Sequence, residues 1–550
     1  MNTIQTKTPK EKRSSFLSGV FLLSCSAVLV KLTGLLTKIP MLHLLGAQGM
    51  GYYNTAYEVY AALFVLSSAG LPVALSILVS RAERGRRRIL RCAMYLFAAM
   101  GGIGCMILWL FADPISARIG NAGAGACMRA LAPAVLFVCL SCGIRGYYQG
   151  LGDMRPTAIS QVIESVGKTV FGVLFAFCAR GAGAPRAQIS AAGAWGLSVG
   201  TLLALIFLMV RISIDFARER TIAQEYITDR ESHKRPPQAI LRPLCAIAVP
   251  ITVSAGITPL IRLLDMVLIL RRLQGCGYTE EMTGSLYGIY STLVIPLYSL
   301  LPMLIGSFAL PLVPGITYAR ERGDLQTERE IVSTSLRLTC LLGLPASMGL
   351  SVFAEPILSL LFGGNRTDSA VMQAYPLLQV LGISVLGGCL VTVLGAMLQA
   401  YGCHKVPLYA MLVGAAVKLS VSWVLLGMPS VGMLGVPIST FLCHLTVILV
   451  ESLVLGRRIA QGTLPVSFLG RTVFASLGAV GGTWLVWIGP MRALGEGRLW
   501  ILPVVALCAG IYLLLILRIG AIRREDVMGL SHGNALWTML IRLRLVRGGE

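Results

Sequence analysis

The sequence predicts an all-α polytopic membrane protein of fourteen transmembrane helices, with two six-helix lobes in parallel repeat plus two C-terminal helices. Three observations lead to this fold class. The composition is too apolar for a soluble protein, apolar windows of membrane-spanning length recur along the chain, and short motifs return in the same order in its two halves. Together they place most of the chain inside a lipid bilayer.

The composition excludes a soluble protein with a charged surface. Of the 550 residues, 55% are hydrophobic and 13% are charged, and the mean hydropathy is +0.76. A globular domain usually has about 25% charged residues. The chain is therefore expected to cross a membrane many times.

The apolar windows give the predicted spans. A helix needs about 20 apolar residues to cross a hydrocarbon core of roughly 30 Å. The first window carries Lys31 and Lys38 and is too long for the apolar part of a signal peptide, so it is expected to remain as the first span. In chain order, the fourteen spans are expected near residues 16–42, 52–79, 89–111, 130–149, 157–179, 188–210, 244–270, 285–312, 331–353, 372–399, 408–427, 434–455, 472–489 and 500–519.

The basic residues predict the orientation of the spans. A net charge of +22 is compatible with nucleic-acid binding, but Lys and Arg gather in alternate gaps between spans. The positive-inside rule assigns such gaps to the cytoplasm, so both termini are expected there, and no nucleic-acid partner is expected. The basic excess is instead expected to contact anionic membrane lipids. The clusters are Arg81–Arg91, Arg211–Arg242, Arg320–Arg337 and Arg457–Arg471.

The two halves of the chain contain a repeat. Gln149, Gly152, Arg155 and Lys168 are followed, 250 residues later, by Gln399, Gly402, Lys405 and Lys418. An even number of spans in each half gives both halves the same orientation, from which alternating access can arise by rocking. The predicted parts are an N-terminal lobe at 1–210, a cytoplasmic linker at 211–243, a C-terminal lobe at 244–455, two further spans at 456–520 and a cytoplasmic tail at 521–550.

The sequence lacks the motifs of ATP-driven pumps and of several hydrolytic or nucleotide-binding enzymes. It contains no GxxxxGK[ST], HExxH or GxGxxG motif. Its five histidines are far apart in sequence, so no metal site is expected. We therefore expect a protein that is not an enzyme and that needs no cofactor.

Ionisable residues lie deep inside several predicted spans. Charge is costly there and usually faces a polar cavity or a partner. Lys31 and Lys38 are seven residues apart and share one helix face. Six of the nine residues at this depth are basic, which favours an anionic substrate over a cationic one. The nine are Lys31, Lys38, Glu58, Arg145, Glu164, Lys168, Arg262, Asp265 and Lys418.

Several of these charges also have a structural interpretation. Glu164 with Lys168, and Arg262 with Asp265, have the spacing of ion pairs within one helical turn. Lys38 lies near the outer end of its span, where a lysine can snorkel to the interface. Glu58 is close enough to the start of its span to be an interfacial residue. Lys31 is too deep for easy snorkelling and is the firmer candidate for binding an anion.

Six segments carry a resemblance to a known family. They are Pro40–Ala47, Gly49–Tyr53, Ser68–Ser76, Gln161–Glu164, Asp265–Gln274 and Glu355–Gly363. They resemble the stage V sporulation protein B family of polysaccharide-type transporters. That family belongs with the MurJ-type lipid II flippases in the multidrug/oligosaccharidyl-lipid/polysaccharide exporter superfamily. The resemblance covers most of the chain.

The resemblance implies a function and a location. It implies a flippase that moves an undecaprenyl-pyrophosphate-linked sugar precursor, such as lipid II, across a bacterial plasma membrane for cell-wall, spore-cortex or polysaccharide synthesis. It also implies a basic cavity for this prenyl-pyrophosphate glycolipid's headgroup and a groove between lobes for its tail. Cell-wall synthesis enzymes are further expected partners. The charged positions that resemble the family's are Lys31, Lys38, Glu164, Lys168, Asp265 and Lys418.

The physical chemistry of the headgroup agrees with this expectation. A pyrophosphate carries at least two negative charges, and fixed cations in a region of low dielectric supply the matching field. We expect Lys31, Lys38 and Arg262 to bind the pyrophosphate-sugar head.

Two alternatives remain open at this level. A cation-coupled multidrug antiporter of the same superfamily would need acidic residues to dominate its interior. A membrane scaffold for cell-wall enzymes would use the loop Arg211–Arg242 and leave the interior charges dispensable.

Overall fold

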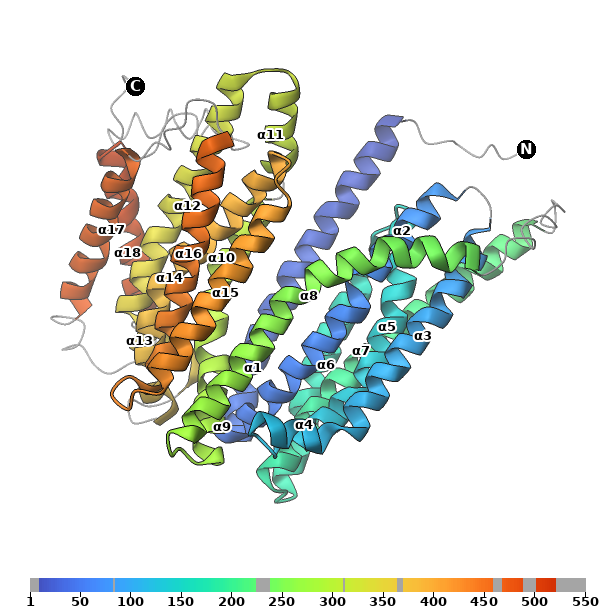
Figure 1. Cartoon of the computed structure of the whole chain (residues 1–550), viewed down its shortest axis with the longest axis horizontal. Coiled ribbons are helices and arrows are strands. Elements are labelled where there is room, and N and C mark those ends of the chain that lie inside the picture. Colours follow the sequence, from blue (N-terminus) through green and yellow to red (C-terminus); the bar gives the residue numbers. More distant parts are fainter. Residues whose placement is uncertain are drawn as a thin grey trace. The chain divides into compact units, whose positions relative to one another are not determined.

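The regular structure of the chain is helical throughout the part that the structure describes. The structure is a computed structural model that describes residues 9–82, 85–223, 238–309, 312–363, 369–458, 467–487 and 501–520. Its helices are long and run side by side in bundles (Figure 1). Within these residues, 12 helical stretches are long and apolar enough to cross a membrane. The predicted all-α membrane fold is therefore confirmed.

The helices fall into two compact units, residues 1–288 and residues 289–550. The helices that begin in the first unit are α1 (Pro9–Ser68), α2 (Gly70–Arg81), α3 (Arg86–Leu110), α4 (Ala112–Ile119), α5 (Ala124–Gly150), α6 (Arg155–Gly181), α7 (Arg186–Ala223), α8 (Gln238–Gly275) and α9 (Glu280–Ile289). Those of the second unit are a π-helix (Tyr290–Val294), α10 (Ile295–Ala309), α11 (Leu312–Glu321), α12 (Leu325–Val352), α13 (Ala354–Phe362), α14 (Ser369–Ala400), α15 (Lys405–Leu426), a 3₁₀-helix (Gly432–Leu434), α16 (Gly435–Arg458), α17 (Ser467–Val486) and α18 (Ile501–Arg518).

The number of spans differs from the expected fourteen at two places. The first two expected spans, 16–42 and 52–79, are joined in α1 and α2, of which Leu32–Arg81 counts as one stretch. The expected span 472–489 falls on α17, which is not among the 12 stretches, and its last residues lie outside the described ones. The total of fourteen stays a prediction.

Helix α1 consists of two arms that meet at Gly46. Gly46 has φ 71° and ψ 175°, which is not a helical conformation. A side chain is strained at such a positive φ, whereas glycine adopts it readily. Met41, before the break, and Gly49, after it, approach Gly193 and Ser190 of α7, respectively. Both arms therefore belong to the same bundle.

The two units share a succession of helices. In the first unit, a long helix, a short one and three long ones follow one another from α3 to α7, and the same succession runs from α12 to α16. The contacts α3 with α5, α5 with α7 and α6 with α7 return as α12 with α14, α14 with α16 and α15 with α16. The short helices α4 and α13 both end at a left-handed glycine, Gly120 and Gly363. The repeat read from the sequence thus has a counterpart in the fold.

The boundary between the compact units lies later than the sequence suggests. The expected N-terminal lobe ends at residue 210, whereas α8 lies in the first unit, which extends to Gly288. Within this unit α8 packs against α1 and α2. The lobes at 1–210 and 244–455 stay a prediction from the repeat.

Small residues bring α6 and α7 into close contact. A Cβ atom at Gly196 of α7 would lie 2.2 Å from the backbone nitrogen of Gly172 of α6. A Cβ atom at Gly200 would lie 2.5 Å from the backbone nitrogen of Lys168. Such glycines allow two backbones to approach where helices associate in membranes. This contact fixes α6 against α7 and so positions the charged side chains that α6 carries.

Candidate functional site

Charged residues from α1, α5 and α6 gather inside the first unit. We call Lys38, Glu58, Arg145, Glu164 and Lys168 the polar cluster. Lys38 is partly buried and lies within electrostatic range of Lys168 and Glu58. Lys168 in turn lies within range of Glu164. The structure therefore brings together four of the eight residues expected to bind substrate.

The two arms of α1 both contribute to the polar cluster. Lys38 lies before Gly46 and Glu58 lies after it. The first arm is tied to α6 by a hydrogen bond of 2.6 Å between the hydroxyls of Thr37 and Thr169. Because these two residues are the sequence neighbours of Lys38 and Lys168, the bond holds the two lysines at a similar depth.

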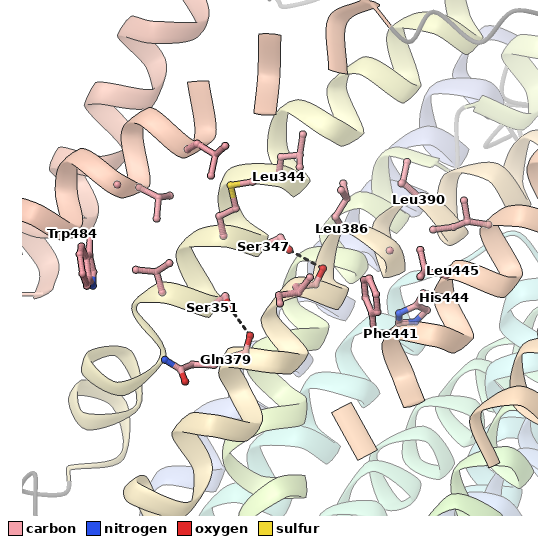
Figure 2. Close-up of a pocket in the computed structure, with 18 residues that line it drawn as sticks. Leu344, Ser347, Ser351, Gln379, Leu386, Leu390, Phe441, His444, Leu445 and Trp484 are labelled. Atoms are coloured by element: carbon pink, nitrogen blue, oxygen red, sulfur yellow. Dashed lines mark hydrogen bonds between the residues drawn. The ribbon is translucent and has the colours of Figure 1, made fainter. Parts of the chain in front are cut away.

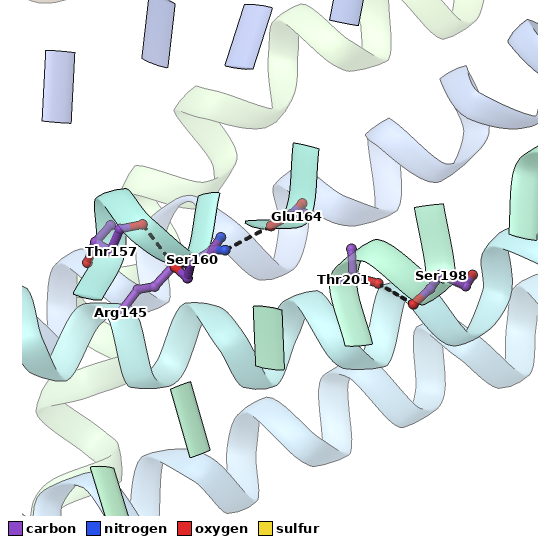
Figure 3. Close-up of polar contacts among 6 residues, drawn as sticks. All are labelled: Arg145, Thr157, Ser160, Glu164, Ser198 and Thr201. Atoms are coloured by element: carbon purple, nitrogen blue, oxygen red, sulfur yellow. Dashed lines mark hydrogen bonds and ion pairs between the residues drawn. The ribbon is translucent and has the colours of Figure 1, made fainter. Parts of the chain in front are cut away.

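Arg145 of α5 occupies the most enclosed part of the polar cluster. Its Nε donates to Ser160 Oγ at 2.9 Å, and its Nη2 lies 2.8 Å from Glu164 Oε2 (Figure 3). The side chain of Arg145 is 9% exposed and that of Glu164 is 22% exposed. Ser160 Oγ donates in turn to the backbone oxygen of Thr157 at 2.9 Å. This chain of bonds joins α5 to α6 and neutralises the charge of Arg145.

Lys168 is surrounded differently from Arg145. Its Nζ lies 4.7 Å from the centre of the Tyr57 ring, a cation–π contact. The ammonium group of Lys168 also donates a hydrogen bond to the hydroxyl of Tyr53, a further neighbour. Glu164, the acid one turn away, is engaged by Arg145. Lys168 therefore presents its charge against neutral aromatic groups.

The tyrosines belong to a row of aromatic rings on the second arm of α1. The ring centres of Tyr53 and Tyr57 are 6.4 Å apart, those of Tyr57 and Tyr60 are 5.8 Å apart, and those of Tyr60 and Phe64 are 6.0 Å apart. Residues spaced by three and four share one helix face. The row gives the polar cluster a rigid wall whose hydroxyls and ring faces are suited to sugars and cations.

The other four expected site residues are on α1, α8 and α15. Lys31 is in the first arm of α1, but its side chain lies outside the described residues. Arg262 and Asp265 are on α8, where Arg262 is exposed and Asp265 is buried. Lys418 is on α15 in the second unit and acts electrostatically on His444. Substrate binding by these residues stays a prediction.

The sequence interpretation missed two parts of the site. Arg145 is recognisable as a deep charge, but no local spacing links it to Glu164, which is 19 residues away. The aromatic row is missed although its spacing of four, three and four is visible in the sequence. The structural interpretation of Glu164 as half of an ion pair is supported, with Arg145 rather than Lys168 as its partner.

The second unit contains an apolar cavity of about 840 Å³ (Figure 2). Its lining comes from α12, α14, α16 and α17 and includes Leu344, Leu386, Leu445 and Trp484. The hydroxyl of Ser347 donates to the backbone oxygen of Gly382 at 2.8 Å, so this polar group is satisfied within the wall. Such a lining suits an apolar ligand.

Metal ligation finds no support among the described residues. No group of three or more His, Cys, Asp and Glu side chains lies together there in a way that could hold a metal ion.

Family comparisons agree with the fold. Residues 16–318 match the family described as polysaccharide biosynthesis protein. Residues 288–424 match the family described as MatE. The two matches together extend over much of both units.

Three relatives from Bacillus subtilis span most of the chain. The membrane protein YabM is 28% identical over 550 residues, which cover 98% of this chain and 99% of YabM. Stage V sporulation protein B is 26% identical over 432 residues, which cover 77% of this chain and 80% of the relative. Lipid II flippase MurJ is 24% identical over 439 residues, which cover 74% of this chain and 76% of the relative.

A solved structure shows the same fold. Lipid II flippase MurJ in an inward closed conformation superposes with a TM-score of 0.67 at 14% sequence identity, covering 90% of this chain and 98% of the other. The resemblance that the sequence segments indicate is therefore confirmed.

Proposed function

Because the chain belongs to the polysaccharide biosynthesis protein family, we propose that it carries a prenyl-pyrophosphate-linked sugar precursor from the inner to the outer leaflet of a bacterial plasma membrane. Its relatives include a lipid II flippase that matches 74% of the chain. It is accordingly a flippase or exporter. We further propose that the substrate is a precursor of this class, with lipid II as the first candidate.

The polar cluster carries this proposal. It holds three cations and two carboxylates, all on helices of membrane-spanning length. Arg145 is paired with Glu164, and Glu58 lies within range of Lys38. Lys168 contacts the ring of Tyr57 and hydrogen-bonds to the hydroxyl of Tyr53. A further anion, such as a pyrophosphate, is the group that this excess of positive charge would attract.

The remaining residues of the proposed binding site are charges at membrane depth, and all but Arg262 and Glu58 also resemble charged positions of the family. We assign Lys31 and Lys38 of α1 and Arg262 of α8 to the pyrophosphate-sugar head. Asp265, Glu58, Glu164, Lys168 and Lys418 complete the proposed set. Arg262 is exposed within the first unit, which leaves its guanidinium accessible to a ligand.

The apolar cavity of the second unit supports a prenyl substrate. It is about 840 Å³ in volume and lined mainly by Leu, Ile, Val and aromatic side chains. An isoprenoid chain consists of methyl and methylene groups, which gain about 0.8 kcal/mol for each buried CH₂. A membrane protein that handles a glycolipid needs an apolar surface for the tail as well as a polar site for the head.

Transport is proposed to proceed by alternating access. The repeated helix order of the two units is the kind of architecture in which one repeat rocks against the other. With both termini in the cytoplasm, as the basic loops predict, an inside-negative potential favours outward movement of an anion. The gain is about 2.3 kcal/mol per charge for each 100 mV. Cell-wall synthesis enzymes are proposed as partners that use the exported precursor.

The proposal is tested with purified full-length protein in proteoliposomes. Fluorescent lipid II, a teichoic-acid lipid precursor and a capsular lipid precursor are compared as substrates, and accessibility in the outer leaflet is measured over time. We expect one of these glycolipids to flip and cationic drugs not to be transported. Drug efflux without movement of any glycolipid would favour the multidrug antiporter instead.

A scaffold function, which would use the predicted loop Arg211–Arg242, is distinguished by deletion of residues 224–237 from it. A scaffold loses its cellular function when this loop is removed and keeps it when the polar cluster is neutralised. A flippase shows the opposite pattern, because its substrate contacts lie in the bundle.

A further inference from the structure

Glu451 is an acidic residue enclosed inside the second unit. It lies on α16 and is 1% exposed. Its Oε2 atom has no hydrogen-bond partner among the described residues. On the facing helix α14, a Cβ atom at Gly395 would lie 3.6 Å from Glu451 Oε1. The carboxyl group of Glu451 therefore lies close to the α14 backbone at Gly395.

The surroundings of Glu451 are apolar. Ile448 and Leu455, three residues before and four residues after it, lie on the same face of α16. Both pack into a core that also contains Leu394 and Leu398 of α14. The carboxyl group is therefore set into a hydrophobic contact between two helices.

No cation acts on Glu451 from the described residues around it. Helix α16 packs against α14, α15 and the 3₁₀-helix Gly432–Leu434. The titratable or charged residues of these elements and of α16 itself are Tyr375, Cys389, Lys405, Tyr409, Lys418, Cys443, His444, Arg457 and Arg458. Lys418 acts on His444 rather than on Glu451. Glu328, an acid beside the same core, accepts a hydrogen bond from Tyr401.

An ionised carboxylate is strongly unfavourable in such a place. A buried charge needs a partner charge or several donors, and without them the group takes up a proton. Neither partner is present around Glu451 in the part of the chain that the structure describes. The neutral carboxylic acid fits this pocket, whereas the anion requires that the contact between α14 and α16 opens and admits water.

We propose that Glu451 is a proton-binding site of the second unit, protonated while α14 and α16 enclose it and deprotonated when they separate. The ligand is a single proton, which on release is transferred from the carboxyl oxygen to water. A second step rests on the proposed function: release and uptake of this proton accompany the conformational change that moves the glycolipid. Protonation and transport are then linked through the packing of α16.

The protonation step is tested by infrared difference spectroscopy on the purified full chain. The spectrum of Glu451→Gln is subtracted from that of the unchanged protein, and the carbonyl band of a neutral carboxylic acid is expected in the difference. The frequency of the band should shift on exchange into deuterated water. Its intensity should fall about tenfold for each pH unit above the midpoint of the titration. A carboxylate band throughout the range from pH 6 to pH 9 would overturn the proposal.

Two control variants make this measurement specific. Glu330→Gln removes an exposed carboxyl of α12 in the same unit and should give a carboxylate difference band at pH 7. His444→Gln removes a partly buried titratable group two turns before Glu451 on α16, whose Nε2 lies 3.1 Å from Tyr298 Oη. It should leave the carboxylic-acid band of Glu451 in place. Loss of that band in His444→Gln would assign the proton to a shared site and contradict a site on Glu451 itself.

The link to transport is tested separately in proteoliposomes with an imposed pH gradient. The unchanged protein and Glu330→Gln should respond to the gradient with at least a threefold change in flipping rate. Glu451→Gln should flip at a rate that the gradient does not alter. A retained response in Glu451→Gln would refute the linkage. Absence of flipping in the unchanged protein would instead count against the proposed function, and the infrared result would still decide the proton site.

Discussion

Arg145 of α5 and Glu164 of α6 form an ion pair in the interior of the first unit, with 2.8 Å between Nη2 and Oε2. Ser160 Oγ accepts a further hydrogen bond from Nε of Arg145 at 2.9 Å. The pair is remote in sequence and holds two helices that both contribute to the polar cluster. It therefore stabilises the frame on which Lys168 is presented.

Breaking this pair should destabilise the protein. Glu164→Gln leaves the guanidinium of Arg145 without its counter-charge, and loss of one partner of a buried pair costs about 3 kcal/mol. We expect a lower midpoint of thermal unfolding in detergent. The double variant Arg145→Met with Glu164→Gln removes both charges and should recover much of the loss. Equal destabilisation in the single and double variants would show that the charges do not interact.

Removal of the Lys168 charge should abolish transport and preserve the fold. Lys168→Met keeps most of the side-chain volume against Tyr57 but cannot attract a pyrophosphate. Flipping in proteoliposomes is expected to fall at least tenfold, with normal membrane insertion and thermal stability. Lys405→Met, at the exposed start of α15, is the matched control and should transport normally. Full activity of Lys168→Met would remove this lysine from the site.

Lys31 is expected to be as important as Lys168. Lys31→Ala should abolish flipping while membrane insertion survives, because the sequence places this charge too deep to reach the interface. The measurement is the same flipping assay, with protein levels in the membrane fraction as the control. Undiminished activity would show that Lys31 does not bind the substrate.

The close contact of α6 and α7 should not tolerate a larger residue. Gly196→Ala places a methyl group 2.2 Å from a backbone atom of Gly172, which cannot move aside as a side chain can. Overpacking of this kind costs about 1–3 kcal/mol. Gly181→Ala, at the end of α6 with no atom within 4 Å of the new methyl group, should be neutral. Thermal unfolding compares the two, and equal midpoints would contradict the contact.

The stability that the start of α12 gives to the fold should depend on pH. Asp324 accepts hydrogen bonds from the backbone nitrogen and hydroxyl of Thr327, which lowers the pKa of Asp324 below its ordinary value of 3.8. A lowered pKa means that the carboxylate stabilises the folded state at neutral pH. This contribution is lost as the pH falls through 3.8 and below. Asp324→Asn should show a weaker dependence of its unfolding midpoint on pH from 6 to 3, and an unchanged dependence would exclude the cap as the cause.

The sequence predicts the membrane fold well, because span length and apolar composition follow directly from the thickness of the bilayer. The repeat of Gln149, Gly152 and Arg155 is also visible in the sequence. In the structure, Gly152 and its counterpart Gly402 are both left-handed. The short helices α4 and α13 escape prediction because they follow the spans without a long polar gap.

The site is predicted in part. Lys38, Glu58, Glu164 and Lys168 are identifiable because charge is rare in apolar spans, and the structure groups them. Their partners are not identifiable, because pairing between α5 and α6 depends on how the helices pack. For the same reason, the sequence does not identify Glu451 as a candidate functional residue. Its position near the end of a span suggests an interfacial residue, whereas the packed unit leaves it only 1% exposed.

The break at Gly46 sets the rotational phase between the two arms of α1. An α-helix turns by about 100° for each residue, so a single residue inserted between Gly46 and Tyr53 would rotate Glu58 and the aromatic row away from Lys38 and Lys168. The same insertion between Lys38 and Gly46 would instead rotate Lys38, and the rest of the first arm with it, relative to the second arm. The number of residues that separate each side chain of α1 from Gly46 therefore decides which side chains meet inside the first unit.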